Sequence, residues 1–201
     1  KMLYDEILEQ GYTTNTVIHY HAVLHQALAY AVKNDYIPSN PVERVKRPKK
    51  NKHIASFYTK EEILTLLDIA KDDPIYIPII LSAYYGFRRS ETIGMRWSAI
   101  DFDNKTITVN HKVIELTENG KTIVYAEDKL KTKSSYRTLP LIPVVEENLL
   151  KHKAKLERNK KLFGNSFCTE YLDYVCVNEM GKLFRPNFVS DHFRILLKKY
   201  G

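Results

Sequence analysis

Hydrophobic residues near the start of the chain recur at the spacing of an amphipathic helix. Between Thr13 and Asn34 one side of that helix is apolar, at Val17, Leu24, Ala27, Leu28 and Ala31. Thr13 or Thr14 provides the N-terminal cap. The preceding segment, Met2 to Gln10, predicts the end of another helix that stops at Gly11.

Proline and asparagine mark the end of this first helical region. Pro38, Asn40 and Pro41 predict a turn and then a short helix from Pro41 to Val45. Two or three helices this short make a thin core. We therefore expect the chain to begin inside a larger helical domain.

A second helical pattern starts with a capping box at Thr59-Lys60-Glu61-Glu62, which opens a helix through about Ala70. The nearly all-apolar stretch Pro74 to Tyr85 predicts a buried helix that Gly86 ends. Another helix starts near Arg88. It is expected to turn Ile93 and Met95 towards the core.

Alternating and β-branched residues after Trp97 predict a small antiparallel sheet, with turns at 104–105 and 118–120. Its expected strands are Ile100–Phe102, Thr106–Val113, Thr122–Ala126 and Arg137–Leu141. Helices are predicted for Pro143–Leu162 and Phe188–Tyr200, with a short strand at Tyr174–Val177 between them. The fold class is therefore mainly α with a small antiparallel β-sheet (α+β).

The charge balance narrows the class of partner. The chain has 31 Lys and Arg against 24 Asp and Glu, a net charge of +7. Such a surface attracts polyanions. The longest apolar run, Ile75 to Ala83, is too short to cross a bilayer, and no lipid anchor is visible, so nucleic acid is favoured over a membrane. A basic protein without a polyanion partner remains the alternative.

The two cysteines, Cys168 and Cys176, have no companion residues at metal-ligand spacing, so we expect neither a zinc site nor a disulfide. No signal peptide is visible at the charged start of the chain. A reducing cytoplasm is the expected compartment.

A basic run separates the two patterned regions. Arg44 to Lys52 holds six basic residues in nine and no acidic one. We expect this linker to neutralise DNA phosphates through Lys46, Arg47, Lys49 and Lys50, with an inert linker as the alternative. Thr14, Asn15, His19, Tyr20 and Lys33 lie along the helix Thr13–Asn34, opposite or beside its apolar stripe. They either enter a DNA major groove or are simply solvated. Of these, Asn15, His19 and Tyr20 are the candidate DNA-binding residues.

The stretch with the most chemistry is Gly86-Phe87-Arg88-Arg89-Ser90-Glu91. Arg88 and Glu91 are three residues apart, so the carboxylate can hold the guanidinium while the guanidinium grips a phosphate. Taken alone, such a pair is most often an ordinary surface ion pair.

Three motifs in order change that interpretation. The arginine stretch, followed by Gly94-Met95-Arg96-Trp97-Ser98 and a strand, resembles the first catalytic-arginine box of the tyrosine recombinase family. Lys131-Thr132-Lys133-Ser134-Ser135-Tyr136-Arg137 resembles the family's β-hairpin lysine segment, especially in integrases of phages and conjugative transposons. Asn40-Pro41-Val42 is similar to the close of the family's core-binding domain.

The resemblance implies a reaction. A tyrosine attacks a DNA phosphodiester to give a 3′-phosphotyrosyl link and a free 5′-hydroxyl, without any metal or nucleotide cofactor. Arg88 would stabilise the non-bridging oxygens and Glu91 would orient Arg88. Lys131 would protonate the leaving 5′-oxygen, with Lys133 as its competitor. Otherwise Lys133 and Arg137 belong to a basic hairpin that contacts the DNA backbone.

The sequence also departs from the family pattern, which continues with a His-x-x-Arg box, a His or Trp and the nucleophilic Tyr. His152 and His192 lack an arginine three residues later, and Tyr200 ends a helix that resembles the one before the missing box. We therefore expect this chain to be a fragment that is monomeric in solution and cannot cleave DNA alone. The resemblance implies that the complete proteins of the family act as tetramers on double-stranded DNA.

The expected domains are the C-terminal part of a helical core-binding domain (1–45), a basic linker (46–55) and the N-terminal part of a catalytic domain (56–201). Two other functions stay open. One is a catalytically inactive DNA-binding relative that occupies recombination sites. The other is an unrelated basic helical regulator, although no convincing recognition helix is visible.

Overall fold

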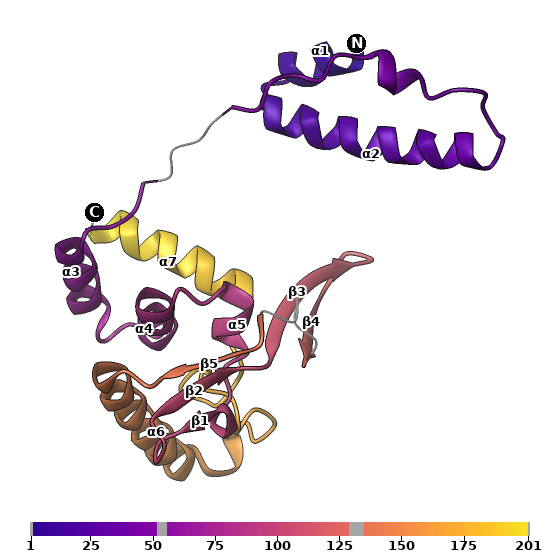
Figure 1. The fold of residues 1–201 in the computed structure, drawn as a ribbon. Helices are drawn as coiled ribbons and strands as arrows, with labels where there is room; N and C mark the ends of the chain where they lie inside the picture. Colours follow the sequence, from indigo (N-terminus) through magenta and orange to yellow (C-terminus); the bar gives the residue numbers. More distant parts are fainter. Residues whose placement is uncertain (1, 52–55, 129–134, 201) are drawn as a thin grey trace. The chain divides into compact units, whose positions relative to one another are not determined.

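The computed structural model describes residues 2–51, 56–128 and 135–200. The chain divides into two compact units, Lys1–Phe57 and Tyr58–Gly201 (Figure 1).

The first unit consists of two α-helices and one 3-10 turn. The helices α1 (Met2–Glu9) and α2 (Thr14–Lys33) precede η1 (Pro41–Arg44). Thr13 caps α2 because its hydroxyl accepts the amide hydrogen of Thr16 at 3.4 Å. A small core of Tyr4, Ile7 and Val17 joins α1 to α2. The helices predicted here are confirmed.

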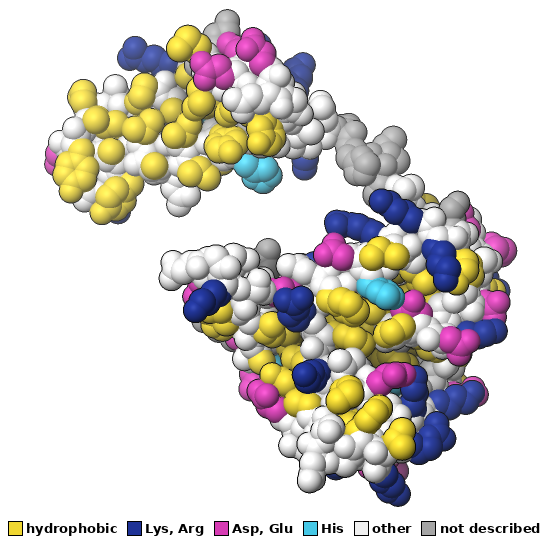
Figure 2. Space-filling view, turned by 180° about the vertical axis from the view of Figure 1, so that it is seen from behind, with side chains coloured by type: hydrophobic (Ala, Val, Ile, Leu, Met, Phe, Trp, Pro, Cys, Tyr) yellow, Lys and Arg dark blue, Asp and Glu magenta, His cyan; other side chains and the backbone are white. Residues whose placement is uncertain are grey.

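Many apolar side chains of this unit are exposed to solvent. Figure 2 shows them gathered on one face of the unit. The exposed large hydrophobic residues of the first unit, on any of its faces, include Leu3, Leu8, Tyr12, Tyr20, Val23, Tyr30 and Tyr36. The thin core expected from the sequence is therefore observed, because two helices of this length bury only one apolar stripe between them.

The second unit opens with two helices in which the predicted cap residues are present. Thr59 and Glu62 close the capping box of α3 (Lys60–Ala70). The next helix, α4 (Tyr76–Tyr85), ends at Gly86, whose φ of 61° is left-handed. It begins two residues later than predicted, because the Asp73 carboxylate accepts the amide hydrogen of Ile75 and holds a turn there.

After α4 the chain turns sharply into the short helix α5 (Arg89–Ile93). The longer helices α6 (Pro143–Phe163) and α7 (Pro186–Tyr200) follow the strands. Both of these were predicted. The main core packs residues of α4, α5, α6 and the strands together, including Ile80, Leu81, Ile93, Ile107, Val109, Val145 and Leu149.

The strands form two sheets, so the prediction of one sheet is wrong. In the first, β1 (Ile100–Asp101), β2 (Thr106–Val109) and β5 (Arg137–Pro140) pair antiparallel in the order β1-β2-β5. In the second, β3 (Lys112–Glu118) and β4 (Lys121–Glu127) form a hairpin that projects from the unit in Figure 1.

The strand predicted as Thr106–Val113 is broken at 110–111, because the buried side chain of His111 turns into the interior and bonds there. Asn119 and Gly120, both with positive φ, make the tight turn of the hairpin.

The prediction of a strand at Tyr174–Val177 is also wrong. This segment makes only isolated bridges, Arg96 with Tyr174 and Val177 with Leu183, because its neighbours are single residues of loops. Cys168 and Cys176 are both free thiols. Within the described ranges, no helix is both long and apolar enough for a membrane span.

Gly94 provides a test of the contact between α5 and the hairpin. A Cβ at this position would lie 2.7 Å from the Cα of Lys112 and 3.0 Å from the carbonyl oxygen of His111. We expect Gly94→Ala to lower the free energy of unfolding by about 2 kcal/mol, because main-chain atoms must move. Urea unfolding followed by the fluorescence of Trp97, the single tryptophan, measures this in the second unit. Ser90→Ala in the same helix is the control, and an equal midpoint for both variants would contradict the expectation.

Candidate functional site

The centre of the candidate site is a buried carboxylate held between two arginines. Glu91 lies on α5, Arg88 directly precedes that helix, and Arg137 begins β5. An Arg88 Nη1–H group donates to Glu91 Oε1 at 2.7 Å, and an Arg137 Nη2–H group donates to Oε2 at 2.8 Å. The main-chain amide of Arg88 also donates to Oε2, at 3.1 Å. The ion pair of Arg88 with Glu91 expected from the sequence is thus present.

Burial and hydrogen bonding act in opposite directions on Glu91, whose side chain is only 3% exposed. Burial raises the pKa of its carboxyl group. Hydrogen bonds from Arg137 and Arg88 outweigh that effect and hold the pKa below its usual value. Glu91 is therefore ionised at neutral pH and keeps both guanidinium groups in fixed positions.

The two arginines differ in how much of each faces solvent. The Arg88 side chain is 65% exposed, whereas that of Arg137 is 27% exposed. Apart from its bond to Glu91, the Arg88 side chain has no hydrogen-bond partner within the part of the chain that the structure describes. Its free N–H groups can therefore bind an anion from solution, in the bidentate manner that suits a phosphate.

The environment of Arg137 is more enclosed. Besides Glu91, its guanidinium donates to the carbonyl oxygen of Ser135 at 3.0 Å and lies over the ring of Phe87, 5.3 Å from the ring centre. The sequence predicted that Arg137 contacts the DNA backbone, and the structure shows in addition that it binds Glu91. The spacing of residues along the chain gives no sign of the bond to Glu91, because 46 residues separate the two side chains.

Lys131 and Lys133 lie outside the described residues. The residues on either side of their segment are Asp128 and Ser135. Asp128 follows β4, and Ser135 is buried just before β5.

The other DNA-binding candidates lie in the first unit. Lys46, Arg47, Lys49 and Lys50 are all exposed, as are His19 and Tyr20 on α2. Asn15 is half-buried, and its side-chain oxygen has no hydrogen-bond partner within the described residues. The fold does not test whether any of these side chains binds DNA.

Two histidines and a tyrosine noted in the sequence have structural contacts. His152 Nε2 donates to the carbonyl oxygen of Val175 at 2.9 Å, and burial lowers the pKa of its imidazole. His192 Nε2 lies 3.0 Å from Asp73 Oδ2. Tyr200 ends α7, ten residues beyond Ser190, which contacts Arg89. Ten residues of helix span about 15 Å, so Tyr200 lies about that far along α7 from the contact of Ser190 with Arg89, the neighbour of Arg88.

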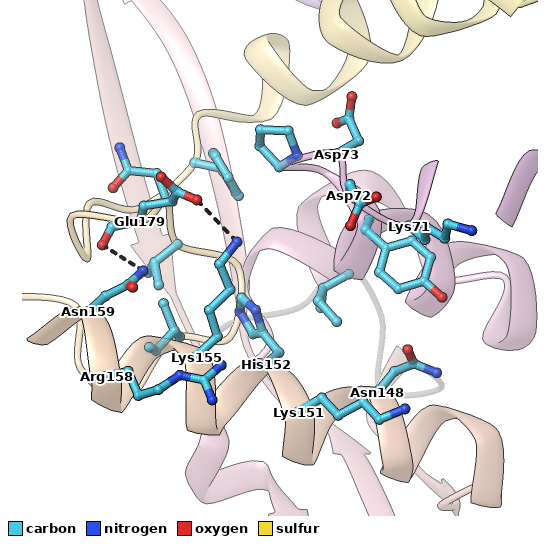
Figure 3. Close-up of a pocket in the computed structure, with 17 residues that line it drawn as sticks. Lys71, Asp72, Asp73, Asn148, Lys151, His152, Lys155, Arg158, Asn159 and Glu179 are labelled. Atoms are coloured by element: carbon cyan, nitrogen blue, oxygen red, sulfur yellow. Dashed lines mark hydrogen bonds and ion pairs between the residues drawn. The ribbon is translucent and has the colours of Figure 1, made fainter. Parts of the chain in front are cut away.

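A cavity of about 640 Å³ lies elsewhere in the second unit, between α6 and the turn before α4 (Figure 3). Both signs of charge line it, and Lys155 pairs with Glu179 at 3.1 Å. Arg88, Glu91 and Arg137 are not among its lining residues. Among the described residues, no group of His, Cys, Asp and Glu has the arrangement of a metal site.

Glu91 provides a test of this cluster. Its pKa is lower in the folded state, so its carboxylate stabilises the fold above the unfolded-state pKa of about 4.5, and this stability is lost as the pH falls through the folded-state pKa. We expect Glu91→Gln to cost about 3 kcal/mol at neutral pH and less in acid. Urea unfolding at several pH values measures the difference.

Asp191→Asn is the matched control, because it removes the carboxylate of an exposed pair with Arg194. Such a pair contributes at most about 1 kcal/mol. A cost for Glu91→Gln that did not change with pH would show that Glu91 acts by packing alone.

Comparison with known proteins gives a consistent family of relatives. No family model matches the chain. The chain is 27% identical to a tyrosine recombinase XerC-like protein of Caldanaerobacter subterraneus subsp. tengcongensis, over 98% of this chain and 54% of that protein. It is 25% identical to the transposase from transposon Tn916 of Enterococcus faecalis, over 96% of this chain and 47% of that protein. The chain thus spans about half the length of these relatives.

Solved structures agree with these relatives. The integrase of transposon Tn1549, solved in complex with transposon right end DNA, has a TM-score of 0.80 at 21% identity, covering 100% of this chain and 63% of that one. Lambda integrase bound to DNA has a TM-score of 0.64 at 16% identity, covering 98% of this chain and 60% of that one. The resemblance of this chain to the tyrosine recombinases, in sequence over nearly its whole length and in fold, is thereby confirmed.

Proposed function

We propose that the chain is part of a tyrosine-type site-specific DNA recombinase, an integrase of a mobile element. In this proposal residues 1–45 are the C-terminal part of the core-binding domain and 46–55 are the basic linker. Residues 56–201 are the N-terminal part of the catalytic domain. The protein would work where bacterial DNA is, in the cytoplasm.

One observation carries the proposal: the exposed guanidinium of Arg88 is held by a buried carboxylate, which a second arginine holds in turn. An ordinary surface ion pair does not need a carboxylate that is buried and accepts hydrogen bonds from two arginines. An arginine that must meet a phosphate in one geometry does need it, because pre-organised donors stabilise charge as it develops without reorganising during the reaction.

The proposed reaction uses this geometry in two steps. A tyrosine hydroxyl attacks the scissile phosphorus, forming the 3′-phosphotyrosyl bond and breaking the bond to the 5′-oxygen. Arg88 neutralises charge on the non-bridging oxygens, while Lys131, or Lys133 in its place, gives a proton to the leaving oxygen. Attack by the 5′-hydroxyl of another strand then reverses the step and releases the tyrosine.

Double-stranded DNA is the proposed partner, and three features support it. The net charge is +7. The linker lysines and arginine are exposed. The integrases of Tn1549 and phage lambda were solved in complex with DNA. By the family resemblance the whole protein would assemble as a tetramer on DNA, whereas the 201 residues would be monomeric in solution.

Arg88 provides the test of the reaction. In the full gene product that carries this sequence, Arg88→Ala should abolish covalent adducts with a DNA substrate that traps the phosphotyrosyl link, a loss of about a hundredfold or more. Denaturing gels of labelled DNA measure the adduct. The 201 residues alone should form no adduct, because none of their described tyrosines is expected to be the nucleophile.

Arg194→Ala is the matched control for this experiment, because Arg194 also belongs to an i,i+3 ion pair and its side chain is 75% exposed against 65% for Arg88. It should leave adduct formation unchanged. Normal adduct formation by Arg88→Ala would refute the proposal. DNA binding without adducts in the unaltered full protein would support instead an inactive relative that occupies recombination sites.

The basic linker is tested on the 201-residue chain itself. Replacing Lys46, Arg47, Lys49 and Lys50 with alanine should reduce the slope of log affinity against log salt by about 3 to 4, since each phosphate contact contributes about 0.9. Fluorescence anisotropy with duplex DNA measures the slope. Replacing Lys151, Lys155, Lys160 and Lys161 on α6 with alanine changes the net charge by the same amount and serves as the control. Equal slopes for the two variants would mark the linker as inert.

A further inference from the structure

An aromatic turn contacts the strand that carries Arg137. The turn is Tyr85-Gly86-Phe87, between the end of α4 and Arg88. The rings of Tyr85 and Phe87 stack on each other, with 4.9 Å between their centres and 13° between their planes. Residues two apart in a continuous helix point in different directions, so this stack depends on the left-handed φ of 61° at Gly86. The turn therefore brings two aromatic rings together directly before Arg88.

Phe87 is the ring that lies against Arg137. It is 5% exposed, and Arg137 Cζ lies 5.3 Å from the centre of its ring. The face of an aromatic ring attracts a cation, and a planar guanidinium can lie flat on it. The same guanidinium donates to the carboxylate of Glu91 at 2.8 Å and to the carbonyl oxygen of Ser135 at 3.0 Å. These three contacts together determine the orientation of Arg137.

Tyr85 holds the opposite end of the same strand. Its hydroxyl donates to the carbonyl oxygen of Pro140 at 3.1 Å and accepts the amide hydrogen of Ile142 at 3.0 Å. Pro140 is the last residue of β5, and Arg137 is the first. Among the described strands β5 pairs only with β2, so it is an edge strand of its sheet. The aromatic turn thus contacts this edge strand at both of its ends.

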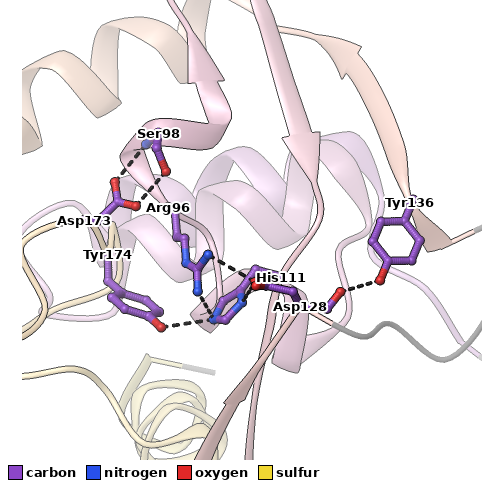
Figure 4. Close-up of polar contacts among 7 residues, drawn as sticks. All are labelled: Arg96, Ser98, His111, Asp128, Tyr136, Asp173 and Tyr174. Atoms are coloured by element: carbon purple, nitrogen blue, oxygen red, sulfur yellow. Dashed lines mark hydrogen bonds and ion pairs between the residues drawn. The ribbon is translucent and has the colours of Figure 1, made fainter.

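A different cluster fixes the chain after α5, around the buried side chain of His111 (Figure 4). His111 Nδ1 lies 2.6 Å from Asp128 Oδ1. Its Nε2 lies 3.1 Å from an Arg96 Nη2 atom and 3.0 Å from the Tyr174 hydroxyl. These contacts hold Arg96, three residues beyond the end of α5. None of them involves the two arginines that bind Glu91, so the aromatic turn and this cluster act on different ends of the helix.

Glu91 transmits the orientation of Arg137 to Arg88. Its Oε2 atom accepts from Arg137, and its Oε1 atom accepts from Arg88. A planar carboxylate that is held at one oxygen cannot rotate freely, so the direction in which the other oxygen accepts depends on where Arg137 lies. A change in the orientation of Arg137 would therefore turn the carboxylate, and with it the exposed guanidinium of Arg88.

We propose that Phe87 is a positioning residue: its ring, stacked on that of Tyr85, holds Arg137 against Glu91 and so sets the direction of the Arg88 guanidinium. The inference deepens the proposed function and rests on it for the role of Arg88. If Phe87 only filled the core, the loss of its ring would cost stability alone and would act on no ionised group.

The first test needs no catalysis and uses the 201-residue chain. Phe87→Leu keeps an apolar side chain but removes the ring face, so Arg137 should loosen and the pKa of Glu91 should rise towards its unfolded-state value of about 4.5. The ionised carboxylate stabilises the fold only above that value, so the variant should lose more stability at neutral pH than in acid. We expect a loss in the folding equilibrium constant that is roughly fivefold larger at neutral pH. Urea unfolding followed by Trp97 fluorescence measures both losses.

Phe184→Leu is the matched control. Phe184 belongs to the same core, is 6% exposed and stacks on Phe188, but no arginine or lysine of the described residues lies over its ring. Its loss of stability should be the same at both pH values. An equal dependence on pH for the two leucine variants would overturn the inference. Phe87→Met, whose flexible side chain fills irregular gaps, repeats the comparison if Phe87→Leu does not fold.

The second test uses the full gene product and a DNA substrate whose scissile phosphate is replaced by a methylphosphonate, which carries no charge. A misdirected Arg88 should matter only where the non-bridging oxygens are charged. Phe87→Leu should therefore slow cleavage of ordinary DNA roughly tenfold but cleave the methylphosphonate near the unaltered rate. Phe184→Leu should cleave both substrates at the unaltered rates. An equal loss for Phe87→Leu on both substrates would overturn the inference, because the defect would not pass through Arg88.

Arg88→Ala separates this inference from the function on which it rests. This variant should lose cleavage of ordinary DNA and regain it on the methylphosphonate. If it cleaves ordinary DNA at the unaltered rate, the proposed role of Arg88 fails, while the unfolding test still decides whether Phe87 holds Arg137 against Glu91.

Discussion

The second unit depends on one buried negative charge. Glu91 is almost fully enclosed, and a carboxylate in that environment stays ionised only if cations and amides compensate for the lost water. Arg88, Arg137 and the main-chain amide of Arg88 do so. Because Arg137 lies 46 residues from Glu91 in the chain, this requirement joins α5 to β5. An exposed guanidinium with a fixed direction is the result.

A second polar cluster surrounds the buried side chain of His111. Asp128 is joined to His111 and Arg96, whereas Arg137 is joined to Glu91. Arg96 in turn lies shortly after α5, the helix that carries Glu91. The residues on both sides of segment 129–134 are thus connected to one short stretch of chain, 88–96, which also contains the arginine proposed to grip the phosphate.

Much of this architecture follows from local sequence. Caps at Thr13 and Thr59, the left-handed glycine at position 86 and the apolar run before it predict helices within one or two residues of those observed. The contact of Arg88 with Glu91 is equally local, because residues three apart on a helix lie on the same face. Each of these features depends on atoms within one or two turns of the chain, so the pattern of residue types is sufficient to indicate it.

By itself, then, the sequence determined the helices, the general class of the fold and the ion pair of Arg88 with Glu91. Only the tertiary structure decided the division into two sheets, the bond of Arg137 to Glu91 and the place of His111. The physical reason is distance along the chain: Arg137 lies 46 residues from Glu91, and Tyr174 lies 63 residues from His111. A buried polar group must find partners in whatever segments pack around it, and no local spacing records which segments those are.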